Sequence, residues 1–368
     1  MEQIVLQLEK LNKSFGNLHV LKDLDLEVAK GEVLTLLGPS GCGKTTTLNL
    51  VAGLINPDSG KIILRGEIVN AYSPQKRKVG MVFQSWALFP HMTVYENIAF
   101  GLKVKKWPKS KIDQKVREML SLIQLPNIQN KFPSQLSGGM RQRVAFARAL
   151  AVEPDVLLLD EPFSNLDELL RRQMEVETRR LQQQIGITTL FVTHNQEEAL
   201  VMSDRVAVMS NGKIVQVDTP LKVYNDPRTS FVCEFLGDAN IFEGQVSEVK
   251  ASHVLVECGG VTFVSSRLGF NAGEEVTVAI RPERISLSRD TGSSDPANLF
   301  PNMFPARVSE VVYKGPTAVY SLILKGVHNV VVTEQCLNPE EIKRPGEEVY
   351  LKIPPDAVLL FKKERNNG

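Results

Sequence analysis

The sequence predicts an α/β domain that carries a helical insertion and is followed by an all-β domain. Short apolar runs that end in glycine-rich or polar turns recur over residues 1–236 and indicate alternating strands and helices. Within this part, the pattern between about 85 and 150 is helical and predicts a helical subdomain. Over residues 237–368, short alternating segments stand between glycine and proline turns, which is typical of an all-β domain.

The composition fits a chain of two or three globular domains. Of its 368 residues, 43% are hydrophobic and 23% are charged. The net charge of +1 gives no indication of a nucleic-acid surface, so no nucleic-acid partner is expected. No apolar run reaches the length of about 18 residues that a membrane helix needs, and residues 1–3 do not begin a signal peptide. The four scattered cysteines fit a reduced, cytoplasmic setting.

Three apolar runs predict buried strands of one parallel sheet. They cover residues 33–37, 156–160 and 189–193. Runs without polar alternation are typical of strands that helices cover on both faces. A glycine-rich turn and a helix from Lys44 follow the first strand, and residues 109–125 read as a helix of the insertion.

The β domain contains an internal repeat. Residues 273–276 recur as residues 346–349, and residues 246–249 recur as residues 308–311, in the same order. Two copies of a small β unit explain both matches best. The stretch 290–302, rich in Ser, Gly, Asp and Pro, is expected to be a loop between them.

The pattern G-x-x-x-x-G-K-[ST] follows the first predicted strand. Its glycines let several backbone N–H groups point at one phosphate, while Lys44 reaches the β- and γ-phosphates and Thr45 offers a hydroxyl to Mg²⁺. A strand before the loop and a helix after it disfavour the alternative of a chance glycine-rich turn. The predicted nucleotide-binding residues of this loop are Gly38, Pro39, Ser40, Gly41, Cys42, Gly43, Lys44, Thr45 and Thr46.

Four polar residues that follow apolar runs are candidates for the chemistry. Asp160 is expected to hold magnesium, and Glu161 to polarise an attacking water as base or orienting group, the alternative being a turn cap before Pro162. His194 is placed to contact the γ-phosphate and the water, although such a histidine alone is more often structural. Gln84 is the weakest signal alone. The order and spacing of the segments strengthen the predictions for both His194 and Gln84.

A second anion site is predicted where Ser137, Gly138 and Gly139 enter a helix. One chain already has a phosphate loop, so the second site is expected to cover the nucleotide of a partner copy. The sequence therefore predicts a head-to-tail homodimer with a nucleoside triphosphate at each half of its seam.

Together these segments resemble the ATPase subunits of ABC (ATP-binding cassette) transporters, over residues 4 to about 235. The resemblance implies ATP and Mg²⁺ as cofactors and an ATP hydrolase coupled to transmembrane transport. It implies that Phe15 stacks on adenine and that Asp167, in the D-loop, lies at the nucleotide. It also makes Gln84 a catalytic Q-loop residue and a magnesium ligand beside Thr45 and Asp160.

The β tail, with Arg281-Pro282-Glu283, is similar to that of importers of the maltose, spermidine, sulfate and ferric-iron type, where it is an OB-like (TOBE) regulatory domain. The resemblance implies a homodimer bound to two integral-membrane permease subunits. It also implies an extracytoplasmic solute-binding protein that delivers the solute to them. It implies a peripheral position on the cytoplasmic face of the inner membrane, with residues 90–97 near the permease groove. Met140 departs from the usual Gln of the signature, for which we expect tuned affinity.

The solute is left open by this sequence. Residues 236–242 and the tail look nearest to polyamine-type subunits, and residues 168–172 also resemble ferric-iron ones. Sulfate or sugar import is the alternative. A rival of another class is a soluble regulatory ATPase without a membrane partner, but the single cassette without a long coiled coil favours transport. Whether the β domain binds a regulator is not fixed by the sequence either.

Overall fold

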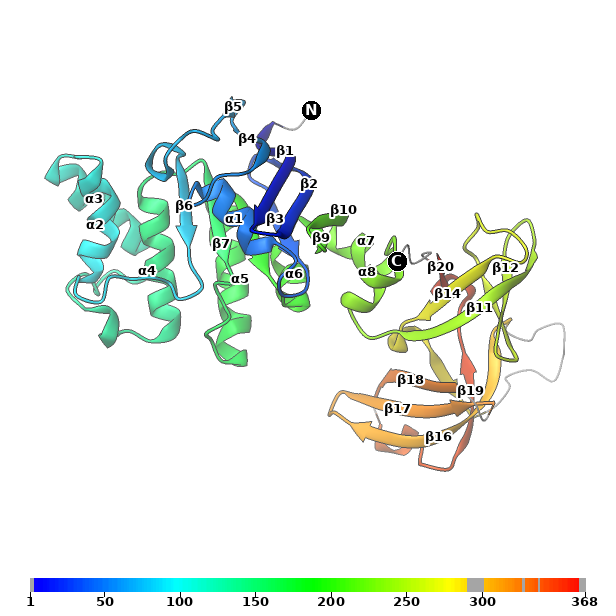
Figure 1. Cartoon of the computed structure of the whole chain (residues 1–368). Coiled ribbons are helices and arrows are strands. Elements are labelled where there is room, and N and C mark those ends of the chain that lie inside the picture. Colours follow the sequence, from blue (N-terminus) through cyan, green and yellow to red (C-terminus); the bar gives the residue numbers. More distant parts are fainter. Residues whose placement is uncertain (1–2, 290–300, 326–327, 337, 364–368) are drawn as a thin grey trace. The chain divides into compact units, whose positions relative to one another are not determined.

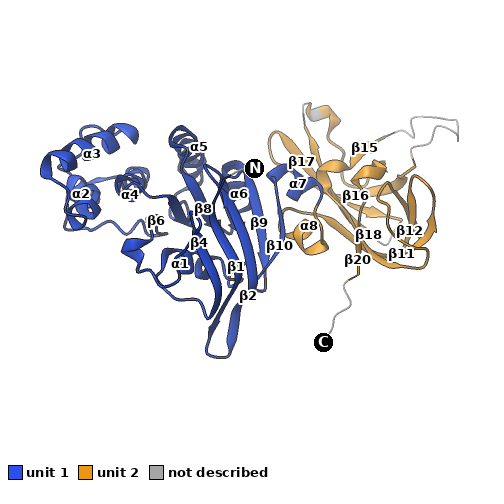
Figure 2. Ribbon diagram, turned by 90° about the horizontal axis from the view of Figure 1, so that it is seen from above, with its two compact units in different colours: residues 1–226 blue, residues 227–368 orange. Residues whose placement is uncertain are grey.

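The computed structural model describes residues 3–289, 301–325, 328–336 and 338–363. The chain forms two compact units, residues 1–226 and 227–368 (Figure 2). From the sequence, the boundary is expected after residue 236. The division in the structure falls between the helices α7 (Pro220–Asn225) and α8 (Ser230–Phe235), one short helix earlier.

A six-stranded sheet forms the centre of the first unit, with the strand order β10-β9-β3-β8-β7-β6 (Figure 1). All neighbouring pairs are parallel except β10 and β9. The three predicted apolar strands are therefore adjacent, as β3, β8 and β7, and the prediction of a parallel sheet is confirmed. The strands are β3 (Val33–Leu37), β6 (Val79–Val82), β7 (Val156–Asp160), β8 (Thr188–Thr193), β9 (Arg205–Ser210) and β10 (Lys213–Asp218).

Each face of this sheet has its own hydrophobic core, because successive side chains of a strand point to opposite faces. Leu157 and Leu159 belong to the core on one face, with residues of the helical insertion. Val156 and Leu158 belong to the core on the other face, with residues of α1. Burial on both faces explains why these strands lack polar alternation.

The helical insertion lies between β6 and β7. Its helices are α2 (Val94–Val104), α3 (Lys109–Leu122) and α4 (Gly138–Ala151), while α1 (Lys44–Ala52), α5 (Glu168–Ile185) and α6 (Gln196–Met202) cover the sheet. The helix predicted over 109–125 ends earlier, at Leu122, because Gln124 adopts a left-handed backbone conformation with φ 58°. At the start of α2, Thr93 and Glu96 form a capping box.

A second sheet of the first unit was not predicted. It is antiparallel, with the order β2-β1-β4-β5, and it packs on α1 through the same core as the central sheet. Its long strands contain several register shifts, which interrupt the alternation that would have revealed them. The strands are β1 (Ile4–Phe15), β2 (Leu18–Ala29), β4 (Ser59–Leu64) and β5 (Glu67–Ile68).

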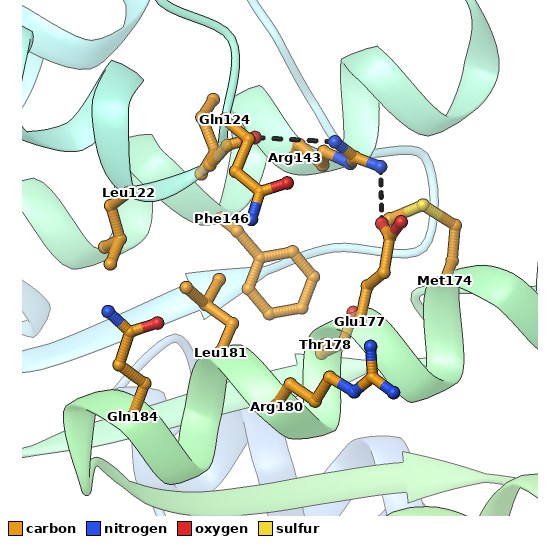
Figure 3. Close-up of a pocket in the computed structure, with 11 residues that line it drawn as sticks. Leu122, Gln124, Arg143, Phe146, Met174, Glu177, Thr178, Arg180, Leu181 and Gln184 are labelled. Carbon is orange, nitrogen blue, oxygen red and sulfur yellow. Dashed lines mark hydrogen bonds and ion pairs between the residues drawn. The ribbon is translucent and has the colours of Figure 1, made fainter.

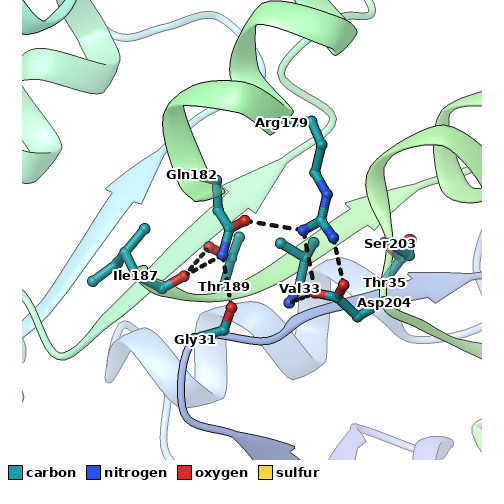
Figure 4. Close-up of polar contacts among 9 residues, drawn as sticks. All are labelled: Gly31, Val33, Thr35, Arg179, Gln182, Ile187, Thr189, Ser203 and Asp204. Atoms are coloured by element: carbon teal, nitrogen blue, oxygen red, sulfur yellow. Dashed lines mark hydrogen bonds and ion pairs between the residues drawn. The ribbon is translucent and has the colours of Figure 1, made fainter. Parts of the chain in front are cut away.

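Polar contacts fasten α5 to the amino end of the central sheet (Figure 4). The Arg179 guanidinium donates to the carboxylate of Asp204, which also accepts from the backbone N–H of Val33 at 2.8 Å. Gln182 donates to the carbonyl oxygens of Gly31 at 2.9 Å and Ile187 at 2.7 Å. These contacts fix one end of the strands and leave the carboxyl end for chemistry.

The second unit is all-β, as predicted, and consists of two five-stranded antiparallel sheets with the orders β13-β12-β11-β14-β20 and β15-β19-β16-β17-β18. The strands are β11 (Asn240–Val249), β12 (Val254–Cys258), β13 (Val261–Ser265), β14 (Glu275–Ile280), β15 (Ser286–Ser288), β16 (Met303–Tyr313), β17 (Thr317–Leu324), β18 (His328–Gln335), β19 (Glu348–Lys352) and β20 (Leu359–Lys362).

The sequence repeat corresponds to these two sheets. β11 pairs with β14 in the first copy, and β16 pairs with β19 in the second. The copies exchange their last strands, because β15 pairs with β19 and β20 pairs with β14. One core fills the space between the sheets. Most of the loop expected over 290–302, residues 290–300, lies outside the described residues.

Among the helices in the described ranges, none combines the length and the apolar character that crossing a bilayer requires.

Candidate nucleotide-hydrolysis site

The phosphate loop connects β3 to α1, and its backbone leaves room only for glycine at two positions. A Cβ on Gly38 would lie 2.4 Å from the carbonyl oxygen of Met209. Gly43 has φ 109°, and a Cβ there would lie 2.5 Å from Cδ2 of Leu21. The chain therefore turns tightly into α1, whose first N–H groups have no partner within the helix.

Lys44 lies inside this loop. Its side chain is 5% exposed, and Nζ donates to the carbonyl oxygens of Gly38 at 2.7 Å and Pro39 at 2.9 Å. The remaining predicted loop residues are placed around it, with Ser40, Gly41 and Thr45 exposed, Thr46 half-buried and Cys42 buried. The ammonium and the start of α1 concentrate positive charge at one point, which suits a phosphate group.

Thr45 and Asp160 meet across two elements. The Thr45 hydroxyl donates to Oδ1 of Asp160 at 3.3 Å, from the first turn of α1 to the last residue of β7. Burial raises the pKa of the Asp160 carboxyl, which the Thr45 hydrogen bond partly opposes. Hydroxyl and carboxylate oxygens are the ligands that Mg²⁺ prefers, and a cation would relieve the desolvated carboxylate. These residues fit the metal as a partial shell, since the described part of the chain holds no cluster of three or more His, Cys, Asp or Glu.

Glu161 carries its carboxylate between two other predicted residues. Oε1 lies 3.1 Å from Nδ1 of His194, and Oε2 lies 3.5 Å from Nε2 of Gln84. Its backbone has φ 42°, a left-handed conformation that is uncommon outside glycine, and its N–H donates to the carbonyl oxygen of Val192 at 2.9 Å. Such backbone conformations concentrate at functional sites.

The structure thus brings together residues from the carboxyl ends of four neighbouring strands. Lys44 and Thr45 follow β3, Gln84 follows β6, Glu161 follows β7 and His194 follows β8. In open parallel sheets, the edge formed by the carboxyl ends is the usual place for ligands.

Phe15 ends β1 on the antiparallel sheet and is 51% exposed. The Lys13 ammonium lies 5.4 Å from the centre of its ring. The neighbouring strand β2 contacts the phosphate loop through Leu21, next to Gly43. An exposed aromatic ring on this sheet is available for stacking.

Ser137, Gly138, Gly139 and Asp167 lie in a separate group at the start of α4 and α5. The Ser137 hydroxyl accepts from the N–H of Met140 at 3.3 Å, and Asp167 caps α5 in the same way. A Cβ on Gly138 would approach Leu166 to 3.1 Å, and one on Gly139 would approach Leu170 to 3.3 Å. Close packing between α4 and α5 is therefore a second reason for glycine here, which the sequence did not reveal.

Three side chains that were not predicted as functional support the Gln84 segment. The Trp86 indole N–H donates to the carbonyl oxygen of Pro162 at 3.2 Å. Arg148 donates to the carbonyl oxygens of Trp86 at 2.9 Å and Ala87 at 2.6 Å, and Asn165 donates to that of Gln84 at 2.8 Å. A single tryptophan and an arginine within a helix carry no pattern that identifies such contacts.

A pocket of about 170 Å³ lies beside α4 and α5 (Figure 3), away from these groups. Phe146 and Leu181 lie in it, and Arg143 forms an ion pair with Glu177 at 2.5 Å on its wall. None of the predicted site residues lines it.

The fold and the site define a P-loop nucleoside triphosphatase with a C-terminal β domain. The family model described as ABC transporter matches residues 21–164, and the one described as TOBE domain matches residues 278–361.

Full-length relatives give the same result. The chain is 42% identical over 371 residues to the spermidine/putrescine import ATP-binding protein PotA of Clostridioides difficile, with 100% of both chains covered. It is 44% identical over 360 residues to the protein of that name from Acetivibrio thermocellus, which covers 98% of this chain and 97% of that one. The corresponding Nostoc protein is 43% identical over 332 residues, with 89% and 86% covered.

The chain belongs to the ABC transporter family, as an ATP-binding subunit of the importer type with a C-terminal TOBE domain. The predicted fold class, the predicted family and ATP hydrolysis coupled to transport are thereby confirmed.

Proposed function

We propose that this chain hydrolyses Mg²⁺-ATP at the seam of a homodimer and so powers polyamine uptake through partner permease subunits. The arrangement that carries this proposal is the Glu161 carboxylate, which lies between His194 and Gln84 and one residue after Asp160. A water near Glu161 would face the end of a triphosphate that is bound by the phosphate loop.

Each residue has a defined role in this proposal. Glu161 orients the water or accepts its proton as the oxygen bonds to the γ-phosphorus and the bond to ADP breaks. His194 contacts the γ-phosphate, and Lys44 binds the β- and γ-phosphates. Thr45, Asp160 and Gln84 would hold Mg²⁺, which would supply positive charge for the phosphate oxygens.

The second half of the site comes from a partner copy. Ser137, Gly138 and Gly139 lie at a helix start that suits an anion, yet they group with α5 rather than with the phosphate loop of the same chain. In the proposed dimer they cover the ATP of the other protomer, together with Asp167. Phe15 stacks on the adenine of its own protomer.

Permease binding is supported by a groove on α2. It has a volume of about 390 Å³ and is lined by Met92, Glu96, Phe100, Lys103 and Val104. The segment that resembles the permease contact, residues 90–97, contributes to it. We propose two permease subunits, a peripheral position on the cytoplasmic face of the membrane and an extracytoplasmic binding protein that delivers the solute.

Polyamine is the proposed solute because relatives aligned over the full chain are named for spermidine and putrescine import. A vesicle assay tests this part. The complex of this chain, its permease and its binding protein should accumulate labelled spermidine with ATP. Accumulation of sulfate, maltose or ferric iron instead would overturn the assignment of the solute, but not that of the ATPase.

Hydrolysis is tested by two substitutions in the full chain. Glu161→Gln should lower kcat by at least about 100-fold while ATP binding persists, because the water loses its partner. Glu67→Gln, at an exposed position of β5 outside the site, is the matched control and should retain the parent rate. Parent-like hydrolysis by Glu161→Gln would refute the proposed role of this residue.

A further inference from the structure

The turn that carries His194 is closed by a ring of hydrogen bonds. The Thr193 hydroxyl donates to Oε2 of Glu198 at 2.6 Å and accepts from the N–H of Asn195 at 3.0 Å. Oδ1 of Asn195 accepts from the N–H of Glu198 at 3.2 Å. The ring joins the last residue of β8 to the first turn of α6, and His194 lies between them.

This ring differs from an ordinary capping box. There, the acid three residues after the N-cap bonds directly to the N-cap N–H. Here Glu198 reaches the Asn195 N–H only through the Thr193 hydroxyl. The Glu198 carboxylate is therefore linked to the residues before and after His194. It restricts the backbone of this turn as well as the start of α6.

Glu198 is 4% exposed and Thr193 is 1% exposed, so their bond is protected from water. Glu175 on α5 is also buried, at 5% exposed, and the charge of Glu198 raises the pKa of its carboxyl. The other titratable groups that act on the two carboxyls are Arg171 and Arg172 on α5, Glu197 on α6, His194 before α6, and Glu161 after β7.

We propose that Glu198 is a positioning residue for ATP hydrolysis, which holds the His194 imidazole against Glu161 through the Thr193 hydroxyl. The proposal rests on the proposed function, because it assigns how that site keeps its geometry. His194 is more than half exposed, and among the described residues its side-chain partner is Glu161, at 3.1 Å. Its orientation therefore depends on the backbone of the turn.

The test compares kcat and KM of full-length variants. Glu198→Leu removes the acceptor and should lower kcat about tenfold or more, with KM for ATP within about twofold of the parent, because misplacement of a reacting group lowers turnover. Glu198→Gln keeps an oxygen acceptor and should recover at least about a third of the parent kcat. Thr193→Val removes the same bond from its other end, so combining it with Glu198→Leu should add little.

Glu175→Gln is the matched control, since it removes a buried carboxyl from the same contact without touching the ring, and its kcat should stay within about twofold. Thermal unfolding separates capping from positioning. If Glu198→Leu lowers the melting temperature but keeps the parent kcat when folded, the inference is wrong. If Glu161→Gln also keeps the parent rate, the role proposed for Glu161 is wrong, and with it the site that Glu198 would position.

Discussion

Oε1 of Glu161 lies 3.1 Å from Nδ1 of His194, across the carboxyl ends of the adjacent strands β7 and β8. The pairing of these strands puts Asp160 opposite Val192. Glu161 and His194, which follow these two residues, therefore lie at the same edge of the sheet. A parallel register thus joins two residues that are far apart in sequence. The sheet therefore determines which residues meet at the site, and the turns after the strands determine how their side chains are oriented.

Lys44 should be required for nucleotide binding. Its ammonium is buried within the phosphate loop and has carbonyl partners there, so Lys44→Ala removes the side-chain cation that we place on the β- and γ-phosphates. Loss of such charge-assisted contacts costs about 2 kcal/mol or more, which is a weakening of roughly 30-fold. Isothermal titration with Mg²⁺-ATP measures this, and unchanged affinity would contradict the placement.

Arg77 should be essential for the stability of the first unit. Its guanidinium is buried and donates to the carbonyl oxygens of Leu50 and Val51, the last turn of α1, and to those of Tyr72 and Asn70. Arg77→Leu removes the buried hydrogen bonds to these acceptors and should reduce the free energy of unfolding by about 3 kcal/mol. Denaturant titration tests it, with the exposed Arg172→Leu as the control that should change little.

Glu175 should make stability depend on pH. Burial, and then the charge of Glu198, raises the pKa of this carboxyl from 4.5 to about 7. Between these values the folded state binds more protons than the unfolded state, so stability falls as the pH rises from 4.5 to 7. Glu175→Gln should therefore stabilise the protein at pH 8, by at most on the order of 3 kcal/mol, and much less at pH 5. Equal melting shifts at both pH values would contradict the prediction.

Two buried asparagines should hold the exchanged repeats of the second unit together. The Asn302 side chain accepts from the N–H of Val264 at 2.7 Å and donates to its carbonyl oxygen at 2.8 Å. Asn240 makes the corresponding pair of contacts with Val331, at 2.7 and 2.8 Å. Asn302→Leu should destabilise this unit by about 2 to 4 kcal/mol, because a buried N–H and C=O lose their partners. Asn338→Leu, at an exposed site, is the control in thermal unfolding.

The sequence predicted what local pattern encodes. Unbroken apolar runs predict the buried strands 33–37 and 156–160, and the spacing of the glycines and Lys44 predicts the phosphate loop. The antiparallel sheet was missed because register shifts break the alternation of β1. The helix α3 was predicted too long because Ile123 and Leu125 continue its apolar pattern after it ends at Leu122.

The rest depends on pairings between distant residues. The repeat was visible, but the exchange of β15 and β20 was not, since either copy could have kept its own strand. Likewise the bond from Thr193 to Glu198 follows from the shape of one turn, which no spacing rule describes. The motifs predict the catalytic residues, and the structure is needed for the groups that orient them.

The central claim is that ATP is held between two copies of this chain, and trapping that state tests it most directly. The Glu161→Gln variant, with Mg²⁺-ATP, is measured by analytical ultracentrifugation alone and with its permease subunits. We predict an ATP-dependent dimer that Ser137→Arg on the same background abolishes. A variant that binds ATP but whose cassettes never associate, even on the permease, would contradict the account.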